Sequence, residues 1–313
     1  AVIHSKGGFM SALQGLANVT DPAVSDTPGI FASFFGPDPF NLLCVVILTS
    51  LGTWGLPQMV QKFYAIDNEA SIQKGTVIST IFALIVSGGC YFLGGFGRLF
   101  SDQIDVKANG FDSIIPTMLS NLSPALIALV VILVLSASMS TLSSLVIASS
   151  STLTIDFLKD NFIKNMSDKK QVLYIRILVV VFIAISAILA LIQYKSSVTF
   201  IAQLMGISWG ALAGSFLAPF MFSLYSKKVS KASCWACFLF SSVLMLANIF
   251  FRAGFPTWLQ SPINCGAFAM FAGMIIVPVV SLFTPKPDKE LVDSAFACYE
   301  KETEVPQKTA LGK

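Results

Sequence analysis

Hydroxyl side chains are concentrated in one long apolar stretch of the chain. Between residues 136 and 154, eleven of nineteen residues are Ser or Thr. On a helix, Ala137, Ser140, Thr141 and Ser144 share one face, because positions three, four and seven residues apart lie on the same side. This face combines small side chains with three hydroxyls, and such oxygens, together with a backbone carbonyl, can coordinate a hard monovalent cation such as Na⁺.

The same hydroxyl-rich face also has a purely structural interpretation. Small residues let transmembrane helices approach closely, and a Ser or Thr hydroxyl can bond back to the carbonyl oxygen four residues earlier. Composition alone leaves both interpretations open.

The elements that carry these residues are predicted to lie in a membrane. The chain is 55% hydrophobic and 12% charged, whereas soluble domains carry about 25% charged residues. We therefore expect an all-α polytopic membrane protein. The net charge of +3 is small and the Lys and Arg residues are dispersed along the chain, so we expect no nucleic-acid partner. With one histidine, and without a carboxylate pair or activated nucleophile in the spans, we expect no enzyme and no metal other than sodium.

Seven apolar windows are long enough to cross a bilayer core of about 30 Å as helices. They cover residues 38–60, 75–97, 124–157, 174–194, 197–225, 232–251 and 262–284. The third window is longer than a simple crossing requires, so it must be tilted or must protrude. A short helix is expected at Ile114–Leu122, in the loop that follows the second window.

The distribution of Lys and Arg predicts the orientation of these spans. Fifteen of the 20 lie on one side, which the positive-inside rule assigns to the cytoplasm. Residues 1–37 are then an external segment, 38–284 the transmembrane domain and 285–313 a cytoplasmic tail. The chain begins without an initiator Met, and we expect it to be the C-terminal part of a longer protein.

The first window is predicted to be interrupted. Gly52 and Gly55 weaken a helix and Pro57 lacks a backbone donor. Transporters expose backbone to a substrate at such breaks, although a proline kink is also tolerated inside a packed helix. If the break is functional, the candidate substrate residues are Thr49, Thr53, Trp54, Pro57 and Gln58.

Three further polar residues are candidates for function. Gln203 lies in the fifth window, where an unpaired amide is costly unless it lines a cavity; the GxxxG spacing of Gly206 and Gly210 beside it predicts close helix packing. Arg98 ends the second window and is a candidate for an outer gate or for binding an anionic substrate, with a snorkelling interfacial arginine as the alternative. Asp156 is expected to pair with a cationic side chain or to cap a helix, with gating as an alternative role.

The hydroxyl-rich stretch resembles a known family. The sequence ASMSTLSSLVIASSSTLTIDFLK, residues 137–159, is similar to the corresponding span of the sodium:solute symporter family, including Ser-Ser-x-Leu-Thr-x-Asp at the family's spacing. The resemblance implies a sodium site formed by the Ala137 carbonyl and the hydroxyls of Ser140 and Thr141. The other half of that site comes from a core helix that precedes this chain in the family.

The first window resembles the family as well. A Gly-rich break, then Pro57, then Lys62-Phe63-Tyr64-Ala65, matches its pattern. Proline-transporting members carry a substrate-contacting aromatic residue where this chain has Thr53, which puts proline in doubt as the substrate. In sugar-transporting relatives a Gln near the position of Gln203 meets the ligand.

The resemblance implies a fold and a function. The fold is a five-plus-five inverted repeat of the leucine-transporter type, of which this chain would hold the second repeat and two peripheral helices. The function is a sodium-coupled symporter in the cell membrane that imports a small organic solute by alternating access, with Na⁺ as coupling ion. The alternative is a symporter-like membrane sensor that binds solute without net transport. The solute and the oligomeric state stay open.

Overall fold

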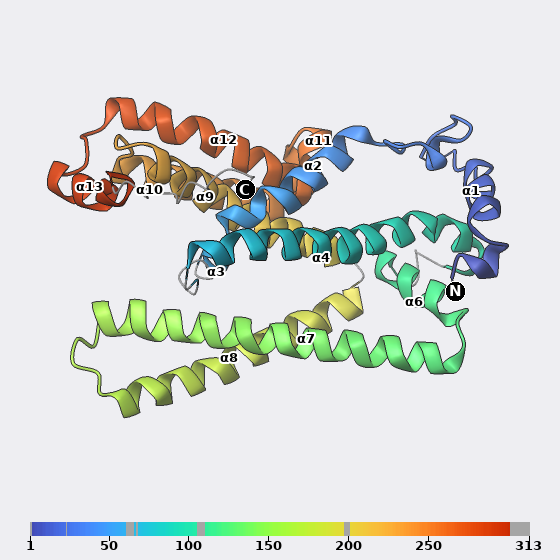
Figure 1. Ribbon diagram of the computed structural model, residues 1–313, viewed down its shortest axis with the longest axis horizontal. Helices are drawn as coiled ribbons and strands as arrows, with labels where there is room; N and C mark the ends of the chain where they lie inside the picture. The colour runs from blue at the N-terminus through green and yellow to red at the C-terminus, as the bar shows by residue number, and fades with distance from the viewer. Residues whose placement is uncertain are drawn as a thin grey trace, which may run out of the picture. The chain divides into compact units, whose positions relative to one another are not determined.

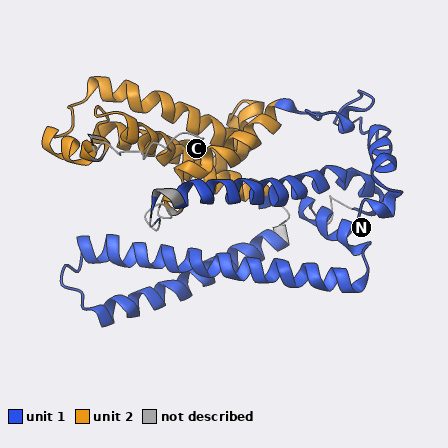
Figure 2. Cartoon of the chain, in the orientation of Figure 1, with its two compact units in different colours: residues 1–39, 65–201 blue, residues 40–64, 202–313 orange. Residues whose placement is uncertain are grey.

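The computed structural model describes residues 2–22, 24–60, 66, 68–104, 110–196 and 201–300. Their regular secondary structure is helical, apart from an isolated bridge between Asp21 and Ser25. The chain divides into two compact units (Figure 2). Unit 1 consists of residues 1–39 and 65–201, and unit 2 of residues 40–64 and 202–313.

Six helices among the described residues are long and apolar enough to cross a bilayer. They are α4 (Glu69–Gly95), α7 (Pro124–Thr152), α8 (Asp168–Ser196), α9 (Ile201–Tyr225), α10 (Lys231–Phe250) and α12 (Pro262–Phe283) (Figure 1). The prediction of an all-α polytopic membrane protein is therefore confirmed.

The first predicted span is interrupted. Helix α2 (Pro39–Ser50) gives way to the 3₁₀ turn η3 (Gly52–Gly55), and a short helix α3 (Pro57–Val60) follows. Leu56 between them has an extended backbone, with φ −87° and ψ 116°. The interruption predicted from the two glycines and Pro57 is thus present, because an extended residue before proline avoids the steric clash of a helical one. The Lys62-to-Ala65 motif lies outside the described residues.

Unit 1 has a small core where its short helices meet. The elements are η1 (His4–Lys6), α1 (Phe9–Ala17), η2 (Ile30–Ala32), η5 (Phe96–Gln103), η6 (Phe111–Ser113) and α6 (Ile114–Ser120). Val2, Ala12, Phe96, Phe100 and Met118 are buried together in this core. The short helix predicted after the second window is confirmed as α6.

The longest helix of unit 1 exceeds the thickness of a bilayer. Helix α7 runs into a π-helical segment η7 (Leu153–Lys159), and α7 and η7 together have 36 residues. At 1.5 Å per residue the helix is roughly 54 Å long, against about 30 Å of hydrocarbon. It must therefore tilt or extend beyond the membrane, as predicted. The most apolar parts of α4, α7 and α8 contain no buried residue, so these helices present surface for lipid or for other helices.

Unit 2 packs α2, α9, α10 and α12 around several buried clusters. It also contains η8 (Arg252–Gly254), α11 (Thr257–Gln260), α13 (Lys289–Phe296) and η9 (Ala297–Glu300). Leu48 of α2, Ala213 of α9 and Met270 of α12 belong to one of these clusters. A Cβ at Gly210 would lie 2.6 Å from Gly266 Cα. The GxxxG stripe of α9 therefore packs closely on α12, as its spacing predicts.

Candidate sodium and substrate sites

The predicted sodium ligands lie on one exposed stripe of α7. Ala137, Ser140, Thr141 and Ser144 are each exposed within unit 1. Since the face carries only small side chains, it leaves room for an ion or for the backbone of another helix. Among the described residues, no second element of unit 1 covers this stripe.

Hydrogen bonds separate the hydroxyls of α7 into two groups. The Ser143 hydroxyl donates to Met139 O at 2.8 Å and the Ser144 hydroxyl to Thr141 O at 2.8 Å. In the described part of the chain, the hydroxyls of Ser140 and Thr141 form no such bond, nor do those of Ser136 and Ser138. Back-bonding therefore accounts for Ser143 and Ser144. It does not account for the hydroxyls of Ser136, Ser138, Ser140 and Thr141, of which Ser140 and Thr141 lie on the predicted stripe.

The helix changes register about two turns beyond Ser144, the last residue of this stripe. Its π-helical segment η7 contains Asp156 and begins after the buried Ser150, whose hydroxyl has no hydrogen-bond partner among the described residues. The Thr154 hydroxyl is also buried and donates to Ser150 O at 2.8 Å. π-Helical turns occur frequently at functional sites. Sequence reasoning did not foresee this turn, because residue types alone do not distinguish it from an α-helix.

In unit 2, the break in the first predicted span is formed against α9. A Cβ at Gly55 would lie 2.9 Å from both Leu217 N and Leu217 Cβ, and a Cβ at Gly52 would lie 3.5 Å from Ala213 Cβ. Both glycines are buried. The close approach of α9 therefore requires glycine at Gly55, and it shields one side of the irregular backbone.

Two of the predicted substrate residues are exposed at the break. Trp54 is 57% exposed and Pro57 is also exposed. The Thr49 hydroxyl donates to Val45 O at 2.8 Å, and the Thr53 hydroxyl donates to Ser50 O at 2.8 Å. Both hydroxyls keep lone pairs that can accept a hydrogen bond from a solute. The side chain of Gln58 lies outside the description.

Gln203 provides a buried amide near the start of α9. Its Oε1 atom is buried and has no hydrogen-bond partner among the described residues. Its neighbour Ala202 packs on the α2–α9–α12 cluster. An unpaired buried carbonyl is costly, and a bound solute or further protein would satisfy it. This observation supports Gln203 as a candidate without identifying its partner.

The two predicted gating residues differ in their surroundings. Arg98 donates from Nη1 to Asp21 Oδ2 at 2.8 Å, and its guanidinium lies 4.0 Å from the centroid of the Phe31 ring. Arg98 therefore ties the segment before α2 to η5. Asp156 is exposed, and in the part of the chain that the structure describes it forms neither the predicted ion pair nor a helix cap. Its predicted pairing and its gating role both stay predictions.

Two buried amides were missed in the sequence. Asn248 of α10 donates from Nδ2 to Leu259 O at 2.8 Å, and Asn264 of α12 donates to Trp258 O at 2.8 Å. Both bonds hold α11 against the longer helices. The signal was available, because an amide inside an apolar span requires a partner. Their Oδ1 atoms have no partner among the described residues.

The chemistry of these sites is that of neutral oxygen ligands. The described residues contain no group of three or more His, Cys, Asp or Glu side chains that could hold a metal ion. Hydroxyls, amides and carbonyls suit a monovalent cation and a small polar solute. Together with the six long helices and the interrupted span, they define a multi-pass α-helical membrane protein with features typical of a secondary transporter.

The model of the Sodium:solute symporter family matches residues 1–239. The chain therefore belongs to the sodium:solute symporter family.

Similar proteins include two symporters from Haemophilus influenzae and a transporter from Bacillus subtilis. The Sodium/proline symporter of H. influenzae is 27% identical over 267 residues, covering 82% of this chain and 52% of that protein. The High-affinity proline transporter PutP of B. subtilis is 26% identical, covering 82% and 54%. The Sodium/pantothenate symporter of H. influenzae is 24% identical, covering 73% and 45%. The chain thus spans about half the length of these relatives.

Proposed function

We propose that this chain is part of a sodium-coupled symporter that imports a small organic solute by alternating access. The observation that carries the proposal is the pair of hydroxyls on Ser140 and Thr141, which do not bond back to their own helix. They stand at the family's sodium-ligand positions, beside the Ala137 carbonyl. Because the chain covers about half of its relatives' length, the remaining ligands would come from a helix outside it.

The substrate would bind beside the break in the first span. Thr49, Thr53, Trp54, Pro57 and Gln58 would contribute to the pocket, with Gln203 supplying an amide. The relatives named above include proline and pantothenate symporters. Those solutes are starting points for a screen, and neither is proposed here as the solute of this chain.

Coupling between Na⁺ and the solute would follow from the different affinities of the conformational states for each ligand. Na⁺ bound at the α7 stripe would favour the outward-open state and complete the solute pocket, so each ligand would raise the affinity for the other. Rocking of one helix bundle against the other would then open the inner side. In this proposal α2–α3, α4, α7, α8 and α9 form the second of two inverted repeats, α10 and α12 are peripheral, and Arg98 and Asp156 are candidate gates.

The protein would span the cell membrane several times with its C-terminus in the cytoplasm, and its partners would be lipid and a small solute. It would not act as an enzyme or bind nucleic acid.

Sodium-driven uptake tests the proposal. The full-length protein in proteoliposomes is given labelled proline, pantothenate and related solutes, with and without a Na⁺ gradient. Loss of one charge-assisted oxygen contact costs roughly 1.5–3 kcal/mol, so we expect Ser140→Ala or Thr141→Ala to raise the half-saturating Na⁺ concentration about ten- to hundredfold. Ser143→Ala is the matched control, because Ser143 lies on the same helix but outside the predicted stripe, and its hydroxyl bonds back to Met139 O.

Two results would contradict the proposal. An unchanged Na⁺ dependence in both variants would remove the ion-site assignment. Solute binding without Na⁺-driven uptake of any tested solute would favour the membrane-sensor alternative over transport.

A further inference from the structure

A groove on unit 2 combines apolar walls with two lysines. Its volume is about 310 Å³, and it lies where α9 ends, the α9–α10 loop begins and α12 ends. Phe222, Val277 and Leu282 contribute apolar surface. Lys228 and Lys286 line the same groove. One cavity therefore offers a surface for hydrocarbon together with two positive charges.

Hydroxyl groups hold the polar part of the groove in place. The hydroxyls of Ser230 and Thr284 lie 2.6 Å apart, and the Ser281 hydroxyl donates to Ser233 Oγ at 2.9 Å. The backbone N–H of Ser230 also donates to Ser281 Oγ at 3.3 Å. These bonds join the start of α10 to the end of α12. The segments that carry the two lysines are therefore anchored at neighbouring points.

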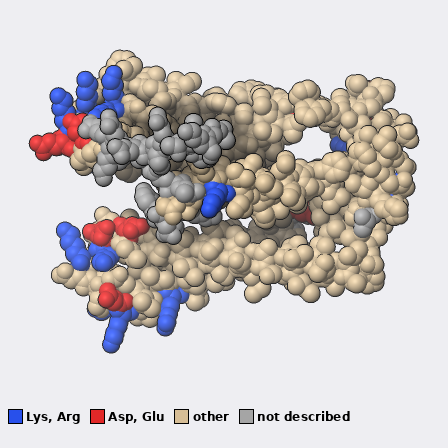
Figure 3. All heavy atoms as spheres, in the orientation of Figure 1, with Lys and Arg blue, Asp and Glu red and all other residues tan. Residues whose placement is uncertain are grey.

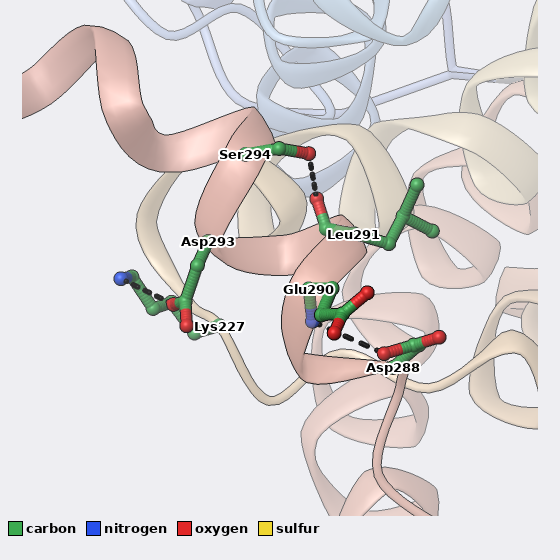
Figure 4. Close-up of polar contacts among 6 residues, drawn as sticks. All are labelled: Lys227, Asp288, Glu290, Leu291, Asp293 and Ser294. Carbon is green, nitrogen blue, oxygen red and sulfur yellow. Dashed lines mark hydrogen bonds and ion pairs between the residues drawn. The ribbon is translucent and has the colours of Figure 1, made fainter.

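Two nearby acidic side chains, Asp293 and Asp288, have partners outside the groove. Lys227 Nζ lies 3.0 Å from Asp293 Oδ1, and the Asp288 carboxylate accepts from Glu290 N at 3.1 Å at the start of α13 (Figure 4). Within the described ranges, neither Lys228 nor Lys286 forms an ion pair. Their charges therefore remain available to a bound anion.

The charge of the groove fits its position in the fold. Figure 3 shows Lys and Arg side chains, with Asp and Glu side chains beside them, at the end of unit 2 that carries the α9–α10 loop and α13. This is the end of the long apolar helices, where lipid headgroups meet the protein in a membrane. Basic pockets between transmembrane helices at such a boundary bind phosphate-bearing headgroups.

We propose that this groove binds an anionic phospholipid from the surrounding leaflet. The phosphate would lie between the Lys228 and Lys286 amines. The acyl chain would lie along Phe222, Val277 and Leu282. A free phosphate ion would make only the polar contacts, and phosphatidylcholine would bring a positive choline group toward the lysines. The groove therefore favours an anionic lipid over both.

Lipid titration of the purified full-length protein tests this site. The protein in a neutral detergent is titrated with phosphatidylglycerol or with phosphatidylcholine of the same acyl chains, and native mass spectrometry counts the bound molecules. An anionic headgroup gains about fivefold in affinity for each nearby lysine. We expect Lys228→Gln with Lys286→Gln to weaken phosphatidylglycerol binding roughly 25-fold and to leave phosphatidylcholine binding unchanged.

A matched variant controls for net charge. Lys164→Gln with Lys169→Gln removes the same two charges from the α7–α8 region of unit 1, outside the groove. Monodisperse elution of both double variants checks that they are folded. An equal loss of binding in the two variants, or equal affinity for the two lipids, would overturn the proposal.

Inorganic phosphate separates a lipid site from a simple anion site. Because the ion lacks an acyl chain, we expect millimolar phosphate to leave bound phosphatidylglycerol in place. Complete displacement at that concentration would show that the groove recognises phosphate alone. The measurement requires no transport, so its outcome is independent of the proposed symport function.

Discussion

Replacing Gly210 by alanine tests the close packing of α9 on α12. A Cβ at this position would lie 2.6 Å from Gly266 Cα and 3.0 Å from Met245 Cε. The first of these atoms belongs to the backbone, so rotation of a side chain cannot relieve the contact. Ordinary van der Waals contact begins at 3.4 Å, so the helices must separate by about 0.8 Å.

The separation affects more than one contact. Ala213, one turn further along α9, belongs to the buried cluster that also holds Leu48 and Met270, so a shift of α9 loosens that cluster. Overpacking of this kind costs about 1–3 kcal/mol, while alanine gains up to about 1 kcal/mol over glycine in helix propensity. Because the clash is with backbone, the cost of overpacking lies toward the upper end of its range, so we expect Gly210→Ala to destabilise the protein by roughly 1–2 kcal/mol.

Gly88 of α4 provides a matched control. A Cβ there meets no atom within 4 Å, so Gly88→Ala gains helix propensity without a clash. The purified variants are heated in detergent, and the monodisperse fraction is followed by fluorescence-detected size-exclusion chromatography. We expect a lower midpoint for Gly210→Ala and an unchanged or higher midpoint for Gly88→Ala. A Gly210→Ala midpoint equal to that of the parent would refute the packing of α9 on α12.

Three further substitutions test contacts other than the packing of α9 on α12. Asp21→Asn removes the half-exposed ion pair with Arg98; we expect a loss below about 1 kcal/mol, seen as faster limited proteolysis before α2. Asn248→Leu leaves the buried carbonyl of Leu259 without its donor and should destabilise the protein by about 1–3 kcal/mol in the same thermal assay. Thr284→Val removes the 2.6 Å hydroxyl contact between α12 and the start of α10, and faster amide hydrogen exchange there is the expected result.

Much of the fold follows from composition and spacing. Long apolar windows predict six of the helices, because few other structures satisfy backbone groups in lipid. The break before Pro57 is predictable for a local reason, since its glycines and proline weaken a helix. The partners of these elements are not predictable in this way. That Gly55 packs on Leu217 depends on residues far apart in the chain, and no local pattern records it.

The candidate site likewise has features that local sequence predicts and features that it does not. The stripe of Ala137, Ser140 and Thr141 follows from helical spacing, and its role as a sodium site stays a prediction. The π-helical segment η7 was missed, because it depends on one extra residue per turn and not on residue type. Likewise, Arg98 meets Asp21 across 77 positions of sequence. A single sequence shows both residues but not their pairing.

The break in the first span is stable only because protein covers part of it. In hydrocarbon, each unsatisfied backbone group costs several kcal/mol, so an interruption must be packed or face a polar cavity. Gly52 and Gly55 are buried, and α9 fills the space beside them through Ala213 and Leu217. A solute that binds at the break must therefore approach from the opposite side, which carries the exposed Trp54.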